Sequence, residues 1–138
     1  MKIIYCHHAE RAVDPRKFRS QEDDITDNGF KDAQLVAEML SNQKIDAIYT
    51  SNFYRCKKTA QVINSLIGAP IFEEERFNEI GSIEGEDWKA GITRHIQAIE
   101  NISDKFTDEE YKANTVFLEE KVTGKLIGAI FLEEDDLR

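Results

Sequence analysis

The sequence predicts an α/β fold in which a mostly parallel sheet is flanked by helices. Two short, largely apolar runs at 2–6 and 47–51 are typical of buried strands. Segments with a helical spacing of apolar residues follow each run, and a short extended segment at 70–72 follows the second helix. Strands and helices that alternate in this way are typical of βαβ units, whose right-handed crossovers pack the helices against a parallel sheet.

Length and composition agree with one folded domain, which we expect to span 1–138. Hydrophobic residues make up 41% of the chain and charged residues 33%. The net charge of −9 argues against nucleic-acid and membrane partners, because binding to either polyanion needs a basic face. No apolar run is long enough for a membrane span. With only Cys6 and Cys56, no signal-like start and no disulfide or metal-ligand spacing, the sequence predicts a cytoplasmic protein with reduced thiols.

The first half of the chain predicts a strand, a loop and a helix. Residues 2–6 are short, apolar and partly β-branched, so we expect a fully buried strand. Residues 9–25 contain Pro15 and many charges, which favours a loop. Thr26 is the expected N-cap of the first helix, and Asp27 stands in its first turn. The buried face of this helix is predicted to hold Ala33, Val36, Ala37 and Leu40.

The middle of the chain repeats this order. Residues 47–51 predict a second buried strand, and residues 53–67 predict a second helix that ends at Gly68. The acidic segment 73–87 is expected to be a loop. A third helix is predicted over 87–102, with an apolar face made of Trp88, Ile92, Ile96, Ile99 and Ile102. On this helix His95 is expected to be a core or boundary histidine, and Trp88 a core anchor.

The last third, residues 103–138, does not continue the pattern. Two apolar-rich runs at 114–120 and 125–132 are separated by 121–124, which resembles a β-hairpin more than another strand–helix unit. Alternatively, the second run begins a short helix. A hairpin with exposed edges could pair with another copy of the chain, so a homodimer is one expectation.

Residues suited to binding phosphate follow the first two predicted strands. Ligands of parallel sheets bind beyond the carboxyl ends of the strands, where His8 and the segment 51–55 are expected. A neutral imidazole can attack phosphorus, and the planar guanidinium of Arg55 can hold phosphate oxygens. Residues 1–19 also carry five basic groups against two acidic ones, so local positive charge in an acidic chain fits a small anionic ligand.

Five segments in order resemble motifs of the histidine phosphatase (phosphoglycerate mutase-like) superfamily. His8-Ala9-Glu10 is similar to the family's Arg-His-Gly-Glu opening, and residues 25–33 are similar to its Leu-Thr-x-x-Gly-x-x-Gln-Ala segment. Residues 45–60 resemble its Ser-x-x-x-Arg-x-x-x-Thr-Ala segment, and residues 76–85 its Arg-Leu-x-Glu with the following glycines. The resemblance covers residues 2–85 and implies a phosphoglycerate mutase-like core with a shortened or remodelled C-terminal part. The chain length resembles the small phosphohistidine-phosphatase-like members.

The resemblance also implies a reaction and roles for single residues. It implies hydrolysis of a phosphomonoester or phosphohistidine through a phosphohistidine at His8, with Glu79 as the proton donor. Substrate binding would involve four residues: Arg55, His7, Arg11 and Ser51, the last as a cap or pocket hydroxyl. No metal or other cofactor is implied, and the partner is a small phosphorylated substrate or a phosphoprotein. A mutase is disfavoured because the short chain leaves little room for the insertions that a mutase uses.

Two departures from the family pattern keep other interpretations open. His7 replaces the family's first arginine and offers fewer donors. The family closes its site with a histidine after a late buried strand, whereas here the candidate strand 115–118 is followed by Glu119 and Glu120. The alternative is therefore a catalytically impaired pseudophosphatase that binds a phosphorylated ligand or partner. A third interpretation is that the active protein carries further residues at its end.

Simpler interpretations of the individual residues also remain. His8 could be an ordinary histidine at a strand end, Arg55 a solvated helix residue, and Glu79 a solvated acid in a carboxylate-rich stretch. Both cysteines are expected to be small core or near-site residues without a nucleophilic role.

Overall fold

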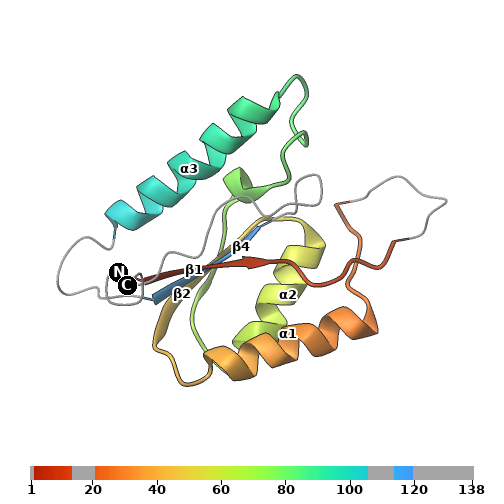
Figure 1. Ribbon diagram of the computed structural model, residues 1–138, viewed down its shortest axis with the longest axis vertical. Coiled ribbons are helices and arrows are strands. Elements are labelled where there is room, and N and C mark those ends of the chain that lie inside the picture. The colour runs from red at the N-terminus through yellow and green to blue at the C-terminus, as the bar shows by residue number, and fades with distance from the viewer. Residues whose placement is uncertain (1, 14–20, 106–113, 120–138) are drawn as a thin grey trace, which may run out of the picture.

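The computed structural model describes residues 2–13, 21–105 and 114–119, and within them it shows the predicted alternation of strands and helices (Figure 1). A short 3-10 helix, η1, interrupts the segment expected to be a loop. The elements in chain order are β1 (Lys2–His7), α1 (Asp27–Leu40), β2 (Ile45–Thr50), α2 (Tyr54–Asn64), β3 (Ile71–Glu73), η1 (Glu75–Phe77), α3 (Trp88–Asp104) and β4 (Asn114–Glu119).

All pairings in the sheet are parallel, and the strand order is β1-β4-β2-β3. Val116 of β4 is in register with Ile4 on one side and with Ile48 on the other. The expected hairpin is therefore wrong, because both edges of β4 are occupied by parallel neighbours. The exposed hairpin edge that suggested a homodimer is absent from β4, and the second run, 125–132, lies outside the described residues.

Helices cover both faces of the sheet, α1 and α2 on one and α3 on the other (Figure 1). Successive side chains of a strand point to opposite faces, which divides the core into two clusters. Ile4 and Ile48 pack with apolar residues of α1 and α2. Ile3, Tyr5 and the other face of β2 pack with Phe77, Ala98 and Ile102. The α/β fold predicted from the sequence is confirmed.

The start of α1 explains why Thr26 and Gly29 stand three residues apart. The Thr26 hydroxyl accepts a hydrogen bond from the Gly29 N–H at 2.9 Å and donates to a carboxylate oxygen of Glu10 at 2.7 Å. A Cβ atom on Gly29 would lie 2.8 Å from the Glu10 carbonyl oxygen, so only glycine allows this approach. The predicted N-cap is confirmed, and it ties α1 to the loop after β1.

The buried face of α3 differs from the predicted one. It holds Gly91, His95, Ala98 and Ile102, whereas Trp88 is 44% exposed and Ile96 is 48% exposed. Trp88 is therefore not a core anchor. Gly91 faces the preceding loop instead, where a Cβ atom would lie 2.5 Å from a side-chain carbon of Ile80, so this close approach needs a residue without a side chain. His95 is a core histidine as predicted, and its ring Nδ1 donates to the Gly91 carbonyl at 2.8 Å.

Two further observations concern single elements. Helix α2 ends at Asn64, before the predicted Ile67, and Gly68 follows with a φ of 75°. No helix within the described parts of the chain combines the length and the apolar character that crossing a membrane requires.

Candidate active site

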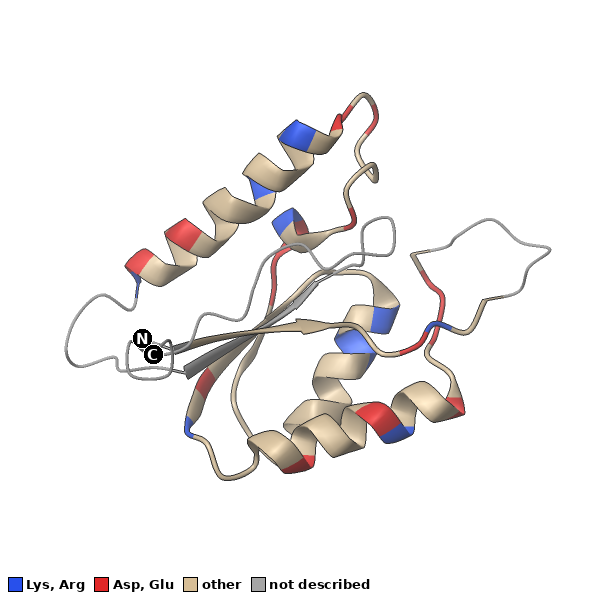
Figure 2. Cartoon of the chain, viewed as in Figure 1, with Lys and Arg blue, Asp and Glu red and all other residues tan. Residues whose placement is uncertain are grey.

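The candidate site lies where strands β1, β2 and β4 end. His7, the last residue of β1, is in register with Glu119, the last residue of β4. Thr50, which ends β2, is in register with Leu118. Basic residues of α2 lie in the first turns of that helix (Figure 2). The site is therefore at the carboxyl edge of a parallel sheet, as predicted from the positions of the motifs.

His8 is held as a neutral imidazole. Its Nδ1 lies 2.6 Å from the Ala9 carbonyl oxygen, and because a carbonyl only accepts, the ring proton is on Nδ1. Burial lowers the pKa of His8 to about 3, and the nearby charges of His7, Arg55 and Arg11 also lower it. At neutral pH the lone pair of the ring is therefore on Nε2, which is the form that a nucleophile needs.

Thr59 connects the residue after His8 to the helix that carries Arg55. Its hydroxyl accepts a hydrogen bond from the Ala9 N–H at 3.0 Å and donates to the Arg55 carbonyl at 2.7 Å. The side chain is buried. No role was predicted for this threonine from the sequence, although it belongs to the segment that resembles the family's Thr-Ala.

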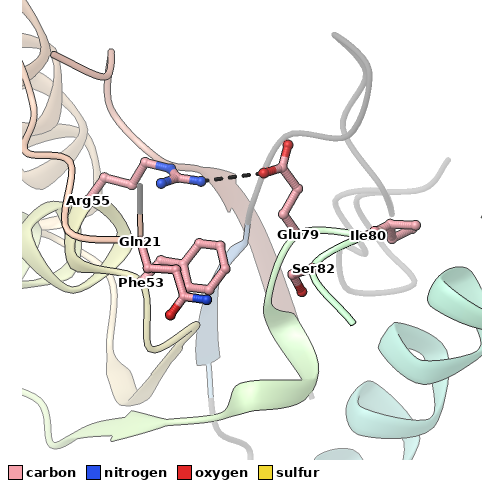
Figure 3. A pocket seen from close by; sticks show the side chains of 7 residues that line it. Gln21, Phe53, Arg55, Glu79, Ile80 and Ser82 are labelled. Atoms are coloured by element: carbon pink, nitrogen blue, oxygen red, sulfur yellow. Dashed lines mark ion pairs between the residues drawn. The ribbon is translucent and has the colours of Figure 1, made fainter. Parts of the chain in front are cut away.

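Arg55 and Glu79 form a pair across the site. The Arg55 side chain is only 1% exposed, and its Nη2 lies 3.5 Å from a carboxylate oxygen of Glu79. The guanidinium also lies over the Phe53 ring, 5.0 Å from the ring centroid. Figure 3 shows the two charged side chains pointing toward one another across the cavity. Arg55 is thus a buried cation with an anionic neighbour and not a solvated helix residue.

In the part of the chain that the structure describes, two cavities lie beside these residues. The larger, of about 330 Å³, is lined by Gln21, Phe53, Arg55, Glu79, Ile80, Gly81 and Ser82. The smaller, of about 160 Å³, lies between the end of β1 and helices α1 and α2, and its lining includes Cys6, His7 and His8. The Thr59 hydroxyl joins the Ala9 N–H to the Arg55 carbonyl, so the two groups of residues are neighbours, and the Arg55 charge contributes after burial to the lowered pKa of His8.

His7, Arg11 and Ser51 occupy different positions around the site. The His7 ring lies 4.2 Å from the His8 ring, and its Nδ1 donates to the His8 carbonyl at 2.9 Å. The Arg11 Nε lies 3.6 Å from Oδ2 of Asp23, and the Arg11 charge is one of the smaller causes that lower the pKa of His8. Ser51 is fully buried, and its hydroxyl accepts from the Phe53 N–H at 3.1 Å. Ser51 therefore shapes the turn into α2 and lines neither of the two cavities.

Other candidates for chemistry are excluded or unsupported by their surroundings. Burial raises the pKa of the Cys6 thiol to about 11, so this cysteine is not a thiolate at neutral pH. Cys56 is completely buried in α2. Within the described residues there is no group of three or more His, Cys, Asp or Glu side chains that could hold a metal ion.

The chain resembles known phosphatases in both sequence and fold, and probable mutases in sequence. The sequence profile of the Histidine phosphatase superfamily (branch 1) matches residues 4–120. Phosphoserine phosphatase 1 of Hydrogenobacter thermophilus is 33% identical over 82 residues, which are 58% of this chain and 39% of that protein. The probable phosphoglycerate mutase GpmB of Serratia proteamaculans is 35% identical over 82 residues, with coverage of 58% and 38%. The chain thus spans less than half the length of these curated relatives.

A solved structure confirms the similarity of the fold. The alpha-ribazole phosphatase from Shigella flexneri superimposes with a TM-score of 0.71 at 16% sequence identity, over 88% of this chain and 74% of that one.

Proposed function

The chain belongs to the histidine phosphatase superfamily, and from this premise we propose that it is a metal-independent phosphatase acting on a phosphomonoester or a phosphohistidine. The observation that carries the proposal is a neutral His8, with its lone pair on Nε2, close to the buried cation Arg55. A small phosphorylated molecule and a phosphoprotein both supply the group that this arrangement would attack.

The proposed reaction has two displacement steps. In the substrate complex, where phosphate takes the place of Glu79 on Arg55 and Glu79 carries a proton, the Nε2 lone pair of His8 attacks phosphorus. The bond from phosphorus to the leaving group breaks, and the Glu79 carboxyl group gives its proton to the leaving atom. This leaves a phosphohistidine and a Glu79 carboxylate. A water molecule then attacks phosphorus, Glu79 takes a proton from the water, and the P–N bond breaks to release phosphate and neutral His8.

Positive groups around His8 would stabilise the phosphoryl group during both steps. Arg55 is the main candidate because its planar fork of N–H donors fits two phosphate oxygens. It lies 3.5 Å from Glu79, so a phosphate held by Arg55 would also lie beside the proposed proton donor. Arg11 adds positive charge near His8, where its charge contributes after burial to the lowered pKa of His8, and the His7 ring lies 4.2 Å from the His8 ring.

The leaving group would occupy the cavity of about 330 Å³ beside Arg55 and Glu79. Beyond these two charged residues its described lining is uncharged, with an aromatic ring from Phe53, an apolar side chain from Ile80 and polar groups from Gln21 and Ser82 (Figure 3).

The test is phosphate release from an aryl phosphate without added metal, with the wild type and His8→Ala assayed side by side. We expect turnover by the wild type and its loss in His8→Ala, because the variant has no atom to form the covalent intermediate. Equal turnover by the two proteins would contradict the assignment of His8 as the nucleophile.

A second candidate function is supported by the end of β4. Glu119 stands there, in register with His7, at the place where the family resemblance leads one to expect a following histidine. Unlike a histidine, a carboxylate has no N–H donor to offer to phosphate. A pseudophosphatase that binds a phosphorylated ligand is therefore the alternative. Binding of phosphate or vanadate by the wild type without any turnover would favour it.

A further inference from the structure

The loop that carries Glu79 runs from η1 to α3, and within it no residue from 78 to 87 belongs to a regular helix or strand. Hydrogen bonds of a sheet or a long helix therefore do not fix the place of Glu79. Two charged residues outside the proposed reaction, Arg94 of α3 and Glu86 at the end of the loop, contact the loop instead.

Arg94 binds the backbone on the N-terminal side of Glu79 and at Glu79 itself. Its Nη1 donates to the carbonyl oxygens of Arg76, at 2.7 Å, and Asn78, at 2.9 Å. Its Nη2 lies 3.4 Å from the carbonyl oxygen of Glu79. A rigid guanidinium that holds three carbonyls at once fixes the path of the chain through Glu79.

Glu86 binds the backbone on the other side. One of its carboxylate oxygens accepts the Gly81 N–H at 3.0 Å and also accepts from Nη2 of Arg94 at 2.7 Å, while the second accepts from Nε of Arg94 at 2.8 Å. The two side chains are 12% and 6% exposed, so water competes little for these bonds. The pair therefore holds the loop before and after Glu79.

A close backbone approach supports the same placement. A Cβ atom on Gly91 would lie 2.5 Å from a side-chain carbon of Ile80, the neighbour of Glu79. Helix α3 thus contacts the loop directly at Ile80, one turn before Arg94 along the helix.

We infer that the Arg94–Glu86 pair is a positioning device that sets the Glu79 carboxyl group at proton-transfer distance from the leaving group. This inference rests on the proposed function. The dependence of the rate on the leaving group distinguishes positioning of Glu79 from stabilisation of the fold. A misplaced proton donor slows the reaction of poor leaving groups more than that of good ones. A good leaving group departs as an anion and needs little proton transfer, whereas a poor one depends on it.

The test is kcat/KM for a series of substituted phenyl phosphates, measured with the wild type, Arg94→Lys and Glu86→Gln. Arg94→Lys keeps the positive charge but loses the planar guanidinium that binds the loop carbonyls and the Glu86 carboxylate together. Glu86→Gln keeps an oxygen for the Gly81 N–H and sets an amide N–H₂ against the Arg94 donors. In both variants we expect kcat/KM for the poorest leaving group to fall by about 10²-fold and to fall by less than about tenfold for nitrophenyl phosphate.

Arg76→Lys is the matched control. Arg76 also joins η1 to α3, through Glu74 and Asn101, but its side chain binds none of the carbonyls from 76 to 79. We expect this variant to keep the wild-type dependence on the leaving group, whatever it loses in stability.

The outcomes separate the two proposals. If Arg94→Lys and Glu86→Gln are folded and keep the wild-type dependence of kcat/KM on the leaving group, the positioning role is overturned. The proposed function is not affected by this outcome. The same steepening in Arg76→Lys would also overturn the positioning role, because any loosening of α3 would then suffice. If Arg94→Lys does not fold, Glu86→Gln alone decides. A wild type without turnover on nitrophenyl phosphate would overturn the proposed function and the positioning role with it.

Discussion

The two halves of the candidate site are built by different means. The first half, called strand-borne here because it follows the ends of β1 and β2, consists of His8 after β1 and Arg55 in the first turn of α2. The Thr59 hydroxyl joins the Ala9 N–H to the Arg55 carbonyl. The loop-borne half, Glu79, lies in an irregular segment held by charged side chains of and beside α3. Backbone geometry places the first half, and a buried ion pair places the second. The two halves should therefore respond differently to mutation, pH and salt.

Loss of the ion pair should have the largest effect on stability. Arg94→Met leaves the Glu86 carboxylate, which is 6% exposed, buried without its main partner, and we expect unfolding to become easier by about 3–5 kcal/mol. Urea unfolding of the variant and the wild type measures this difference. A loss below about 1 kcal/mol, the range of exposed pairs, would mean that water solvates Glu86.

In the strand-borne half, removal of the guanidinium should mainly affect ligand binding. Arg55→Ala should weaken the binding of phosphate by about 1.5–3 kcal/mol, because a charge-assisted hydrogen bond is lost. Isothermal titration with phosphate or vanadate gives the affinity. Lys57→Ala is the control, since Lys57 pairs with the exposed Glu73 at 3.3 Å. Its removal should change the free energy of phosphate binding by at most about 1 kcal/mol. Equal effects of the two substitutions would place Arg55 outside the phosphate site.

The link between the two strand-borne residues can be broken without touching either of them. Thr59→Val keeps the shape of the side chain but leaves the Ala9 N–H without its acceptor, at an expected cost of about 1–3 kcal/mol in the free energy of unfolding. Thr93→Val, at an exposed position of α3, is the control and should change stability by less than about 0.5 kcal/mol. A neutral Thr59→Val would show that Ala9 finds another acceptor.

Acid should destabilise the strand-borne half through His8. Because burial lowers the pKa of His8 from 6.5 to about 3, the unfolded chain binds a proton between these values that the folded chain does not bind. Stability is therefore unaffected by His8 above 6.5 and falls as the pH drops from 6.5 toward 3. His8→Gln should show a shallower loss over this range in urea unfolding at several pH values. Parallel curves would mean that His8 titrates normally in the folded protein.

Much of the strand-borne half could be predicted from the sequence. Residues 2–6 and 47–51 predicted the strands, and the order of elements predicted that His8 and Arg55 would meet at one sheet edge. Thr26 and Gly29 carried a local signal for the start of α1. These features depend on apolar periodicity, capping and strand ends, which are properties of short stretches of chain.

Predictions that depended on distant contacts were less accurate. The run at 114–120 predicted a hairpin, but β4 lies between β1 and β2, and a strand's neighbours cannot be deduced from its own residues. The apolar spacing of α3 predicted a buried Trp88, but close approach at Gly91 turned another face inward. Ser51 was expected as a cap or pocket hydroxyl, and only the structure shows that its hydroxyl accepts the Phe53 N–H in the turn before α2.

The sequence by itself determined the α/β class, the superfamily and the two residues that strand ends deliver to the site, because those depend on local patterns of apolar and polar residues. Only the tertiary structure decided how Glu79 is held. Arg94 and Glu86 are unremarkable charges on the printed sequence, and their role arises from a fold that brings them against the carbonyls of Arg76, Asn78 and Glu79 and the N–H of Gly81. Such contacts between side chains and distant backbone have no periodicity, so no pattern along the chain predicts them.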